Sequence, residues 1–155
     1  MFDPNQFLDV QLTEANDTVI RPVPEGEYTA FVDEITSRTW TSRKDPSKSG
    51  VTLELIWNID SPEVAKELGR DKITVKQGVM LDLTEVGGLD MGKGRNVGLG
   101  RLREAFDLNK PGVPISPSQF VGRMAKVSVK HRLGESDAGS EPPIYAEVRA
   151  VARLG

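Results

Sequence analysis

The residues with the clearest capacity for chemistry are cations and aromatic rings, spread over segments that alternate like β-strands. Single-stranded nucleic acid is held by cations that follow its phosphates and by flat rings on which its bases stack. Trp40 stands in a polar stretch, residues 37–50, that holds four basic residues and one carboxylate. Residues 122–134 add four basic residues and no carboxylate. The candidate nucleic-acid-binding residues are Arg38, Trp40, Arg43, Lys44, Lys48, Lys72, Lys76, Lys126, Lys130, Arg132, Tyr145 and Arg149.

Each of these cations also has a structural explanation. The outward face of a strand is polar, and Lys or Arg on an edge strand discourages pairing with other sheets. A single lysine fits both readings, whereas a tryptophan inside a basic loop fits nucleic-acid binding better. Trp57 is different, because it shares its parity with Leu53 and Leu55 and is expected in the core or in a groove wall. The segment 134–143 is acidic, so we do not expect DNA against it.

A glycine-rich segment, Gly87–Gly94, has the spacing of a phosphate-binding loop, G-x-x-x-x-G-K. That loop needs a Ser or Thr after its lysine to bind the magnesium of the nucleotide, and Gly94 stands there instead. We therefore interpret the segment as a flexible link, although Lys93 and Arg95 could touch a nucleic-acid backbone. A nucleotide-hydrolysing enzyme rests on this incomplete motif alone.

Carboxylate catalysis and metal binding have little support. Glu54 and Asp82 lie on outward strand faces without the spacing of a metal-binding motif. His131 is the only histidine and cysteine is absent, which excludes thiolate zinc sites and argues against a Ser–His–Asp triad. We expect His131 to be a packed or hydrogen-bonded edge residue. The sequence thus predicts a protein that is not an enzyme and has no metal or cofactor.

The length of 155 residues suits one domain with a real core. The net charge of −3 is unevenly distributed, since residues 1–20 contain four carboxylates and no Lys or Arg. We predict an acidic, extended amino-terminal arm over 1–24 and one domain over 25–155. No apolar run could span a membrane and no secretory signal is present, so we expect a soluble protein of a reducing compartment.

Alternating apolar residues predict five strands, at 25–41, 51–59, 72–84, 121–132 and 144–153. The first is long enough to require strong curvature and a bulge. In the fifth, Ile144, Ala146, Val148, Ala150 and Ala152 are expected to face inward. Ser61-Pro62 and Gly69 bound a short helix between the second and third strands, and a second helix is expected near 96–108. A helix between the third and fourth of five strands is the order of the five-stranded oligonucleotide/oligosaccharide-binding barrel, the OB-fold.

The chain resembles the small phage-encoded single-stranded-DNA-binding proteins with an OB-fold. The resemblance covers residues 22–153 and rests on loose patterns: residues 24–28 opening the first strand, the basic loop after it, residues 53–57, the helix 99–106, and residues 120–127. It implies binding of single-stranded DNA in phage replication or recombination, in the cytoplasm of the infected host, without sequence preference or catalysis.

The chain departs from that family at its ends. Many such proteins end in an acidic tail that recruits partner enzymes, whereas this sequence is acidic at residues 1–20 instead. We expect single-stranded DNA as the main partner, and replication or recombination proteins as partners of the arm, or else competition between the arm and DNA for the groove. Self-association stays open, and no membrane partner is expected. The alternative function is a phage structural or protein-interaction module on a β-barrel that binds no nucleic acid.

Overall fold

The computed structural model describes residues 3–16, 21–135 and 142–154. Five strands, β1 (Gly26–Thr41), β2 (Ser49–Ile59), β3 (Thr74–Leu81), β4 (Met124–Leu133) and β5 (Ile144–Ala152), close into a barrel-like ring in the order β1-β2-β3-β5-β4. Two helices, α1 (Pro62–Leu68) and α2 (Val97–Ala105), and two short 3-10 turns, η1 (Pro4–Leu8) and η2 (Pro117–Phe120), complete the described elements. The mainly β prediction is confirmed, and so is the helix between β2 and β3.

The first strand closes the ring because it belongs to two pairings. Its first half, Gly26–Phe31, pairs with β4, and Ala30–Thr41 pairs with β2. The register shifts between Val32 and Glu34, which is the expected bulge. A bulge bends its strand and increases the local twist, and here it turns β1 from one partner to the other.

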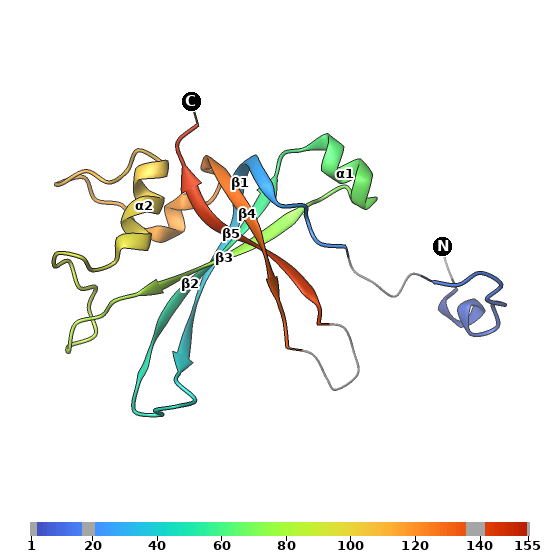
Figure 1. The fold of residues 1–155 in the computed structure, drawn as a ribbon, viewed down its shortest axis with the longest axis horizontal. Helices are drawn as coiled ribbons and strands as arrows, with labels where there is room; N and C mark the ends of the chain where they lie inside the picture. Colours follow the sequence, from blue (N-terminus) through green and yellow to red (C-terminus); the bar gives the residue numbers. More distant parts are fainter. Residues whose placement is uncertain (1–2, 17–20, 136–141, 155) are drawn as a thin grey trace.

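Two long hairpins, β1–β2 and β4–β5, project from the same side of the ring, and the helices lie toward the other end (Figure 1). α1 begins at Ser61, whose side chain accepts from Val64 N at 3.3 Å, and ends at Gly69 with φ of 66°. Both ends are as predicted. Figure 1 also shows α1 and α2 on opposite sides of the ring.

The core fills the ring with inward strand residues and closes it with α2 and η2. Trp57 is fully buried and its ring lies 5.9 Å from that of Phe106, which lies 5.3 Å from Phe120. Trp57 Nε1 donates to Gln77 Oε1 at 2.8 Å, so this indole has its polar atom satisfied. The prediction of Trp57 as core or groove wall thus resolves to core.

Two predictions about strands were wrong. β3 ends at Leu81 instead of continuing to 84, and Leu83 forms only an isolated bridge with Leu89. In β5, Ala150 and Ala152 are exposed, because Arg149 is an extra residue between the pairs Ser128–Ala150 and Val129–Val148 and shifts the alternation. Ile144 is also exposed, out on the hairpin beyond the core.

The amino-terminal arm joins the ring at Arg21–Pro24. Val23 is buried, its carbonyl is 2.7 Å from His131 Nε2, and Tyr28 donates its hydroxyl to Pro24 O at 2.8 Å. Farther out, Pro4–Leu8 form the turn η1, whereas an extended arm was expected. No helix among the described residues has the length and apolarity needed to cross a membrane.

Candidate nucleic-acid interface

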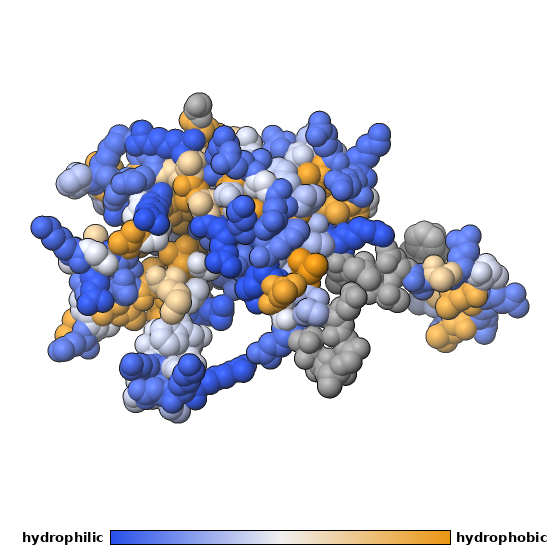
Figure 2. Space-filling view, viewed as in Figure 1, coloured by the Kyte–Doolittle hydropathy of each residue, from blue (hydrophilic) through white to orange (hydrophobic). Residues whose placement is uncertain are grey.

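The tip of the β1–β2 hairpin presents cations whose charge is not neutralised nearby. The connecting loop is closed by Ser42 N donating to Lys48 O and Lys48 N donating to Asp45 O, both at 2.9 Å. Asp45, the one carboxylate of the loop, accepts from Ser47 N at 3.1 Å. Within the described part of the chain, Arg43, Lys44 and Lys48 form no ion pair. Figure 2 shows this tip as a hydrophilic projection with open space between it and the β4–β5 hairpin.

Trp40 lies at the base of this tip and rests on a glycine of the paired strand. Its Cα partner is Gly50, and a Cβ added there would come within 2.7 Å of Trp40 Nε1. The ring is half-buried, and its Nε1 is buried without an acceptor in the described residues. No hydrogen bond to a described residue therefore holds this indole in place, and leaving its buried donor unpaired is unfavourable. The ring can therefore move onto a base without breaking one.

From Trp40 the cations continue across the outside of β1, β2 and β3. Arg38 Nε is 3.1 Å from Glu54 Oε2, and Lys76 Nζ is 3.6 Å from Glu54 Oε1. One carboxylate on β2 is thus shared between a cation of β1 and a cation of β3. Both cations are more than half exposed, so the contacts are screened surface ion pairs that a phosphate can displace at low cost.

The same arrangement recurs on the other side of β3. Lys76 is the Cα partner of Glu147 on β5, and this is the only register pair between the two strands. Glu147 is 2.6 Å from Arg149 Nε and 3.4 Å from Arg132 Nε on β4. Lys130, whose Cα partner is Glu147, faces the same side. The two groups of ion pairs therefore lie on the outer surface of the five strands and adjoin at the Lys76–Glu147 pair.

Tyr145 lies at the β4–β5 end of this surface. Its ring packs against a glycine, as the Trp40 ring does. A Cβ added at Gly134 would lie 2.5 Å from Tyr145 Cε2. The guanidinium carbon of Arg132 is 5.2 Å from the centre of the ring, within cation–π range. The ring is 49% exposed, so one part of it is open to a stacking base.

We call this surface the outer belt. It contains ten of the twelve predicted residues, together with Glu54 and Glu147: Arg38, Trp40, Arg43, Lys44, Lys48, Lys76, Lys130, Arg132, Tyr145 and Arg149.

Two predicted cations lie away from the belt. Lys72 comes before β3 and its Nζ is 2.6 Å from Asp33 at the bulge of β1. Lys126 lies on β4 between Thr29 of β1 and Ala152 of β5, beyond the register shift that separates it from Lys130, and its Nζ is 3.0 Å from Glu27. Alternation alone placed both residues outward but could not tell which side of the closed ring each one faces.

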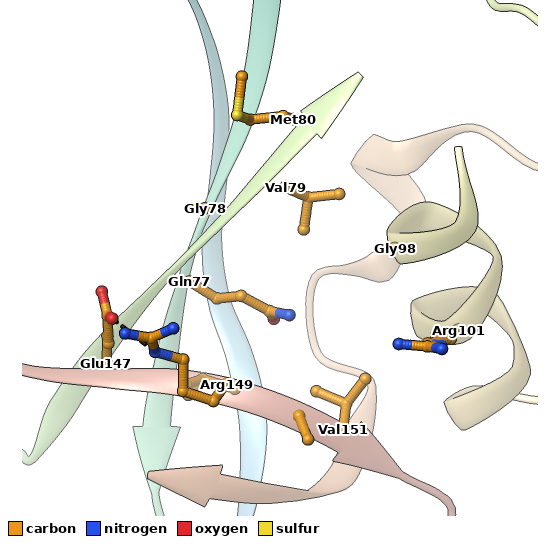
Figure 3. A pocket seen from close by; sticks show the side chains of 11 residues that line it. Gln77, Gly78, Val79, Met80, Gly98, Arg101, Glu147, Arg149 and Val151 are labelled. Carbon is orange, nitrogen blue, oxygen red and sulfur yellow. Dashed lines mark ion pairs between the residues drawn. The ribbon is translucent and has the colours of Figure 1, made fainter. Parts of the chain in front are cut away.

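A cleft of 440 Å³ adjoins the belt where β3 and β5 separate beyond their single pair. Figure 3 shows Gln77 and Val79 facing this space from β3, Val151 from β5 and Arg101 from α2, while Arg149 turns toward Glu147. The guanidinium of Arg101 forms no hydrogen bond or ion pair with any described residue. It is the residue that the sequence reasoning missed, because that reasoning looked for cations only on strands and their loops.

The remaining sequence candidates have structural roles. In the Gly87–Gly94 segment, Gly88 N and Gly92 N already donate to Thr84 Oγ1 and Asp90 Oδ1, so these two N–H groups are not free to hold a phosphate. Asn96 fastens the segment to the end of β3, because its Oδ1 accepts from Asp82 N and its Nδ2 donates to Asp82 O, both at 2.8 Å. His131 is a hydrogen-bonded edge residue, as expected.

Comparisons add no relative to this picture. No family model matches the chain, and no curated protein matches it.

Among the residues that the structure describes, no three His, Asp or Glu side chains gather as a metal site requires.

Proposed function

We propose that the ring is an OB-fold and that the outer belt binds single-stranded DNA without sequence preference. The observation that carries the proposal is the continuity of the belt: cations and two rings follow one another over all five strands instead of being scattered over the molecule. The helix between the third and fourth strands fits the OB-fold, which commonly binds oligonucleotides on one side of its barrel.

The parts of the belt have separate tasks in this proposal. Arg43, Lys44 and Lys48 pair with phosphates directly, because no ion pair among the described residues has to be broken first. Trp40 and Tyr145 each stack on a base, which contributes on the order of 1–3 kcal/mol per ring. Stacking and phosphate pairing are indifferent to base identity, so binding is independent of sequence.

Glu54 and Glu147 act as exchangeable counterions. In the free protein they hold Arg38, Lys76, Arg132 and Arg149 in extended positions on the belt. An incoming phosphate replaces the carboxylate as the partner of each cation. This arrangement keeps the cations ordered and weakens binding by the free energy of each displaced ion pair.

Protection and organisation of single-stranded intermediates in phage replication or recombination is the biological role that we propose, without catalysis. The acidic arm would contact replication or recombination proteins. A protein-interaction module without nucleic-acid binding is the second candidate, and two observations favour it: several belt cations are already paired, and the arm exposes apolar side chains.

One titration separates the two functions. Fluorescently labelled oligo-dT and a duplex of equal length are titrated with the full chain at two salt concentrations, and anisotropy is measured. DNA binding predicts saturable binding of oligo-dT that weakens steeply with salt, because each neutralised phosphate releases counterions, and weaker binding of the duplex. The interaction module predicts no saturable binding of either at low salt.

A further inference from the structure

The arm exposes apolar side chains on an acidic background. Phe7, Leu8, Val10 and Leu12 are 63%, 83%, 50% and 81% exposed, and residues 3–16 contain three carboxylates and no cation. Soluble proteins rarely leave several large apolar side chains together in water without a partner surface. The arm therefore has the composition of a segment that docks into an apolar groove with a basic rim.

Such a groove lies along α2. Two adjoining cavities of 370 and 280 Å³ share Met91, Leu99 and Arg103. Apolar residues line most of the second, and several are open to solvent: Met91 is 74%, Val113 50% and Leu89 41% exposed. Pro114, Ile115 and Phe120 complete its apolar wall.

Arginines supply the opposite charge at this groove. Arg103 lines both cavities and donates Nη2 to Leu108 O at 3.2 Å, while its buried Nε has no acceptor in the described residues. Arg95 lines the first cavity and is 3.6 Å from Asp90. Glu104 also lines the first cavity, but the three arginines there, Arg95, Arg101 and Arg103, outnumber it. The apolar surface and its cations thus complement the apolar residues and carboxylates of the arm.

The position of the groove favours the arm of another molecule. The arm leaves the ring at Arg21, whose carbonyl accepts from Arg70 Nη2 at 2.7 Å just beyond α1. α1 and α2 lie on opposite sides of the ring (Figure 1). The arm therefore starts on the side of its own ring that is away from the α2 groove.

We propose that residues 3–16 of one copy bind in the α2 groove of a second copy. The contact joins two different surfaces, so it closes as a reciprocal pair or a ring, or continues into head-to-tail chains, according to the rotation between neighbours. It does not involve the outer belt and is independent of the proposed DNA binding.

Mixing two full-length variants tests this proposal in the absence of DNA. Phe7→Ser with Leu8→Ser removes the arm anchors, and Met91→Glu with Val113→Glu places acidic side chains at exposed groove positions. Mass is followed by sedimentation velocity as concentration rises. We expect the wild type to form pairs or larger assemblies and each variant alone to stay at 17.0 kDa. Their equimolar mixture should stop at two chains, because it holds one working arm and one working groove per pair.

A control and a second measurement protect the test against misfolding. Val86→Ser removes a 94% exposed apolar side chain from the same loop but does not line either cavity, and it should assemble like the wild type. In addition, a labelled peptide of residues 3–16 should bind the full-length arm variant, and bind the groove variant at least tenfold more weakly.

Three results would overturn the proposal. A wild type that stays monomeric at every concentration excludes the contact. A mixture that never forms pairs shows that the arm does not bind the groove of another copy, whereas pairs in the mixture beside a monomeric wild type indicate docking within one chain. An arm variant that assembles as the wild type does shows that another surface is responsible.

Discussion

In each of the two hairpins an aromatic side chain packs against a glycine, but the two hairpins differ in charge. Trp40 lies over Gly50 on β1–β2, and Tyr145 lies over Gly134 on β4–β5. The loop of the first is basic, with three cations against Asp45, and the segment 134–143 of the second holds three carboxylates and no cation. The second is also fastened to the start of the domain, since His131 N donates to Glu25 Oε2 at 2.8 Å.

This difference shows that a ring on a glycine is not sufficient to identify a DNA contact. If the outer belt binds DNA as we propose, the basic β1–β2 tip attracts phosphates and the acidic segment 134–143 repels them, so the two hairpins should contribute unequally to affinity. On β4–β5 the proposed contact is limited to the strands, where Arg132 lies over the Tyr145 ring and both Arg132 and Arg149 pair with Glu147. The predictions that follow test this asymmetry.

Removing the charge of the β1–β2 tip should have the largest effect. Arg43→Gln with Lys44→Gln and Lys48→Gln is expected to weaken oligo-dT binding by more than tenfold at low salt. Three lost phosphate contacts should also reduce the slope of log affinity against log salt by about 2. The matched control neutralises three lysines off the belt, Lys66, Lys72 and Lys126. Equal losses in the two triple variants would remove the asymmetry.

Loss of the Trp40 ring should cost about 1–3 kcal/mol, or about 5- to 150-fold in affinity. Trp57 is buried in the core, so Trp40→Ala should also abolish most of the fluorescence quenching that oligo-dT causes. Gly50→Ala is the complementary variant, because its methyl group forces the ring from its seat without removing it. Unchanged affinity in Trp40→Ala would take this residue out of the interface.

Neutralising the shared carboxylates should strengthen binding. Glu54→Gln frees Arg38 and Lys76, and Glu147→Gln frees Arg132 and Arg149. Since an exposed ion pair contributes about 0–1 kcal/mol, each variant should bind oligo-dT about two- to fivefold more tightly at low salt. Glu27→Gln makes the same change beside Lys126, off the belt, and should have a smaller effect. Weaker binding in both belt variants would mean that the carboxylates position the cations and are not displaced.

The smallest effect concerns pH and the attachment of the β4–β5 hairpin. The hydrogen bond from His131 N lowers the pKa of Glu25 below its ordinary value of 4.5, and the charges of His131 and Lys130 act in the same direction. A carboxyl whose pKa is lowered by folding stabilises the fold above its unfolded pKa, and this contribution disappears as the pH falls through the folded pKa. Glu25→Gln should therefore lose less stability than the wild type between pH 5 and acid, as measured by urea unfolding. An identical loss in both proteins would contradict the role of this bond.

Much of the fold follows from local patterns in the sequence. The caps of α1 are set by Ser61, Pro62 and Gly69, and the alternation of residues 51–59 fixes which face of β2 is buried. The extra residue Arg149 broke the pattern of β5, because a bulge depends on how the strand must bend around a closed ring. Such bending is a tertiary property that alternation cannot report.

Less of the candidate site than of the fold could be predicted from the sequence. The cations could be identified, but their counterions Glu54 and Glu147 come from neighbouring strands and appear only once the register is known. The glycines beside the Trp40 and Tyr145 rings could not be identified from sequence either, because they lie on or next to the paired strands. The same holds for Arg101, because only the packing of α2 places it at the cleft between β3 and β5. Lys72 and Lys126 alternate outward like the belt residues. Only the three-dimensional structure shows that they pair with Asp33 and Glu27, away from the belt.

Amide chemical-shift mapping with short oligo-dT shows whether one DNA strand occupies the outer belt. We expect shifts at residues 38–52 in the β1–β2 hairpin, at 76–80 in β3 and at 145–151 in β5. Little change is expected around Lys126 and in α1. Shifts that cluster at those two places while the belt stays unchanged, or no shifts at all at low salt, would contradict binding at the belt.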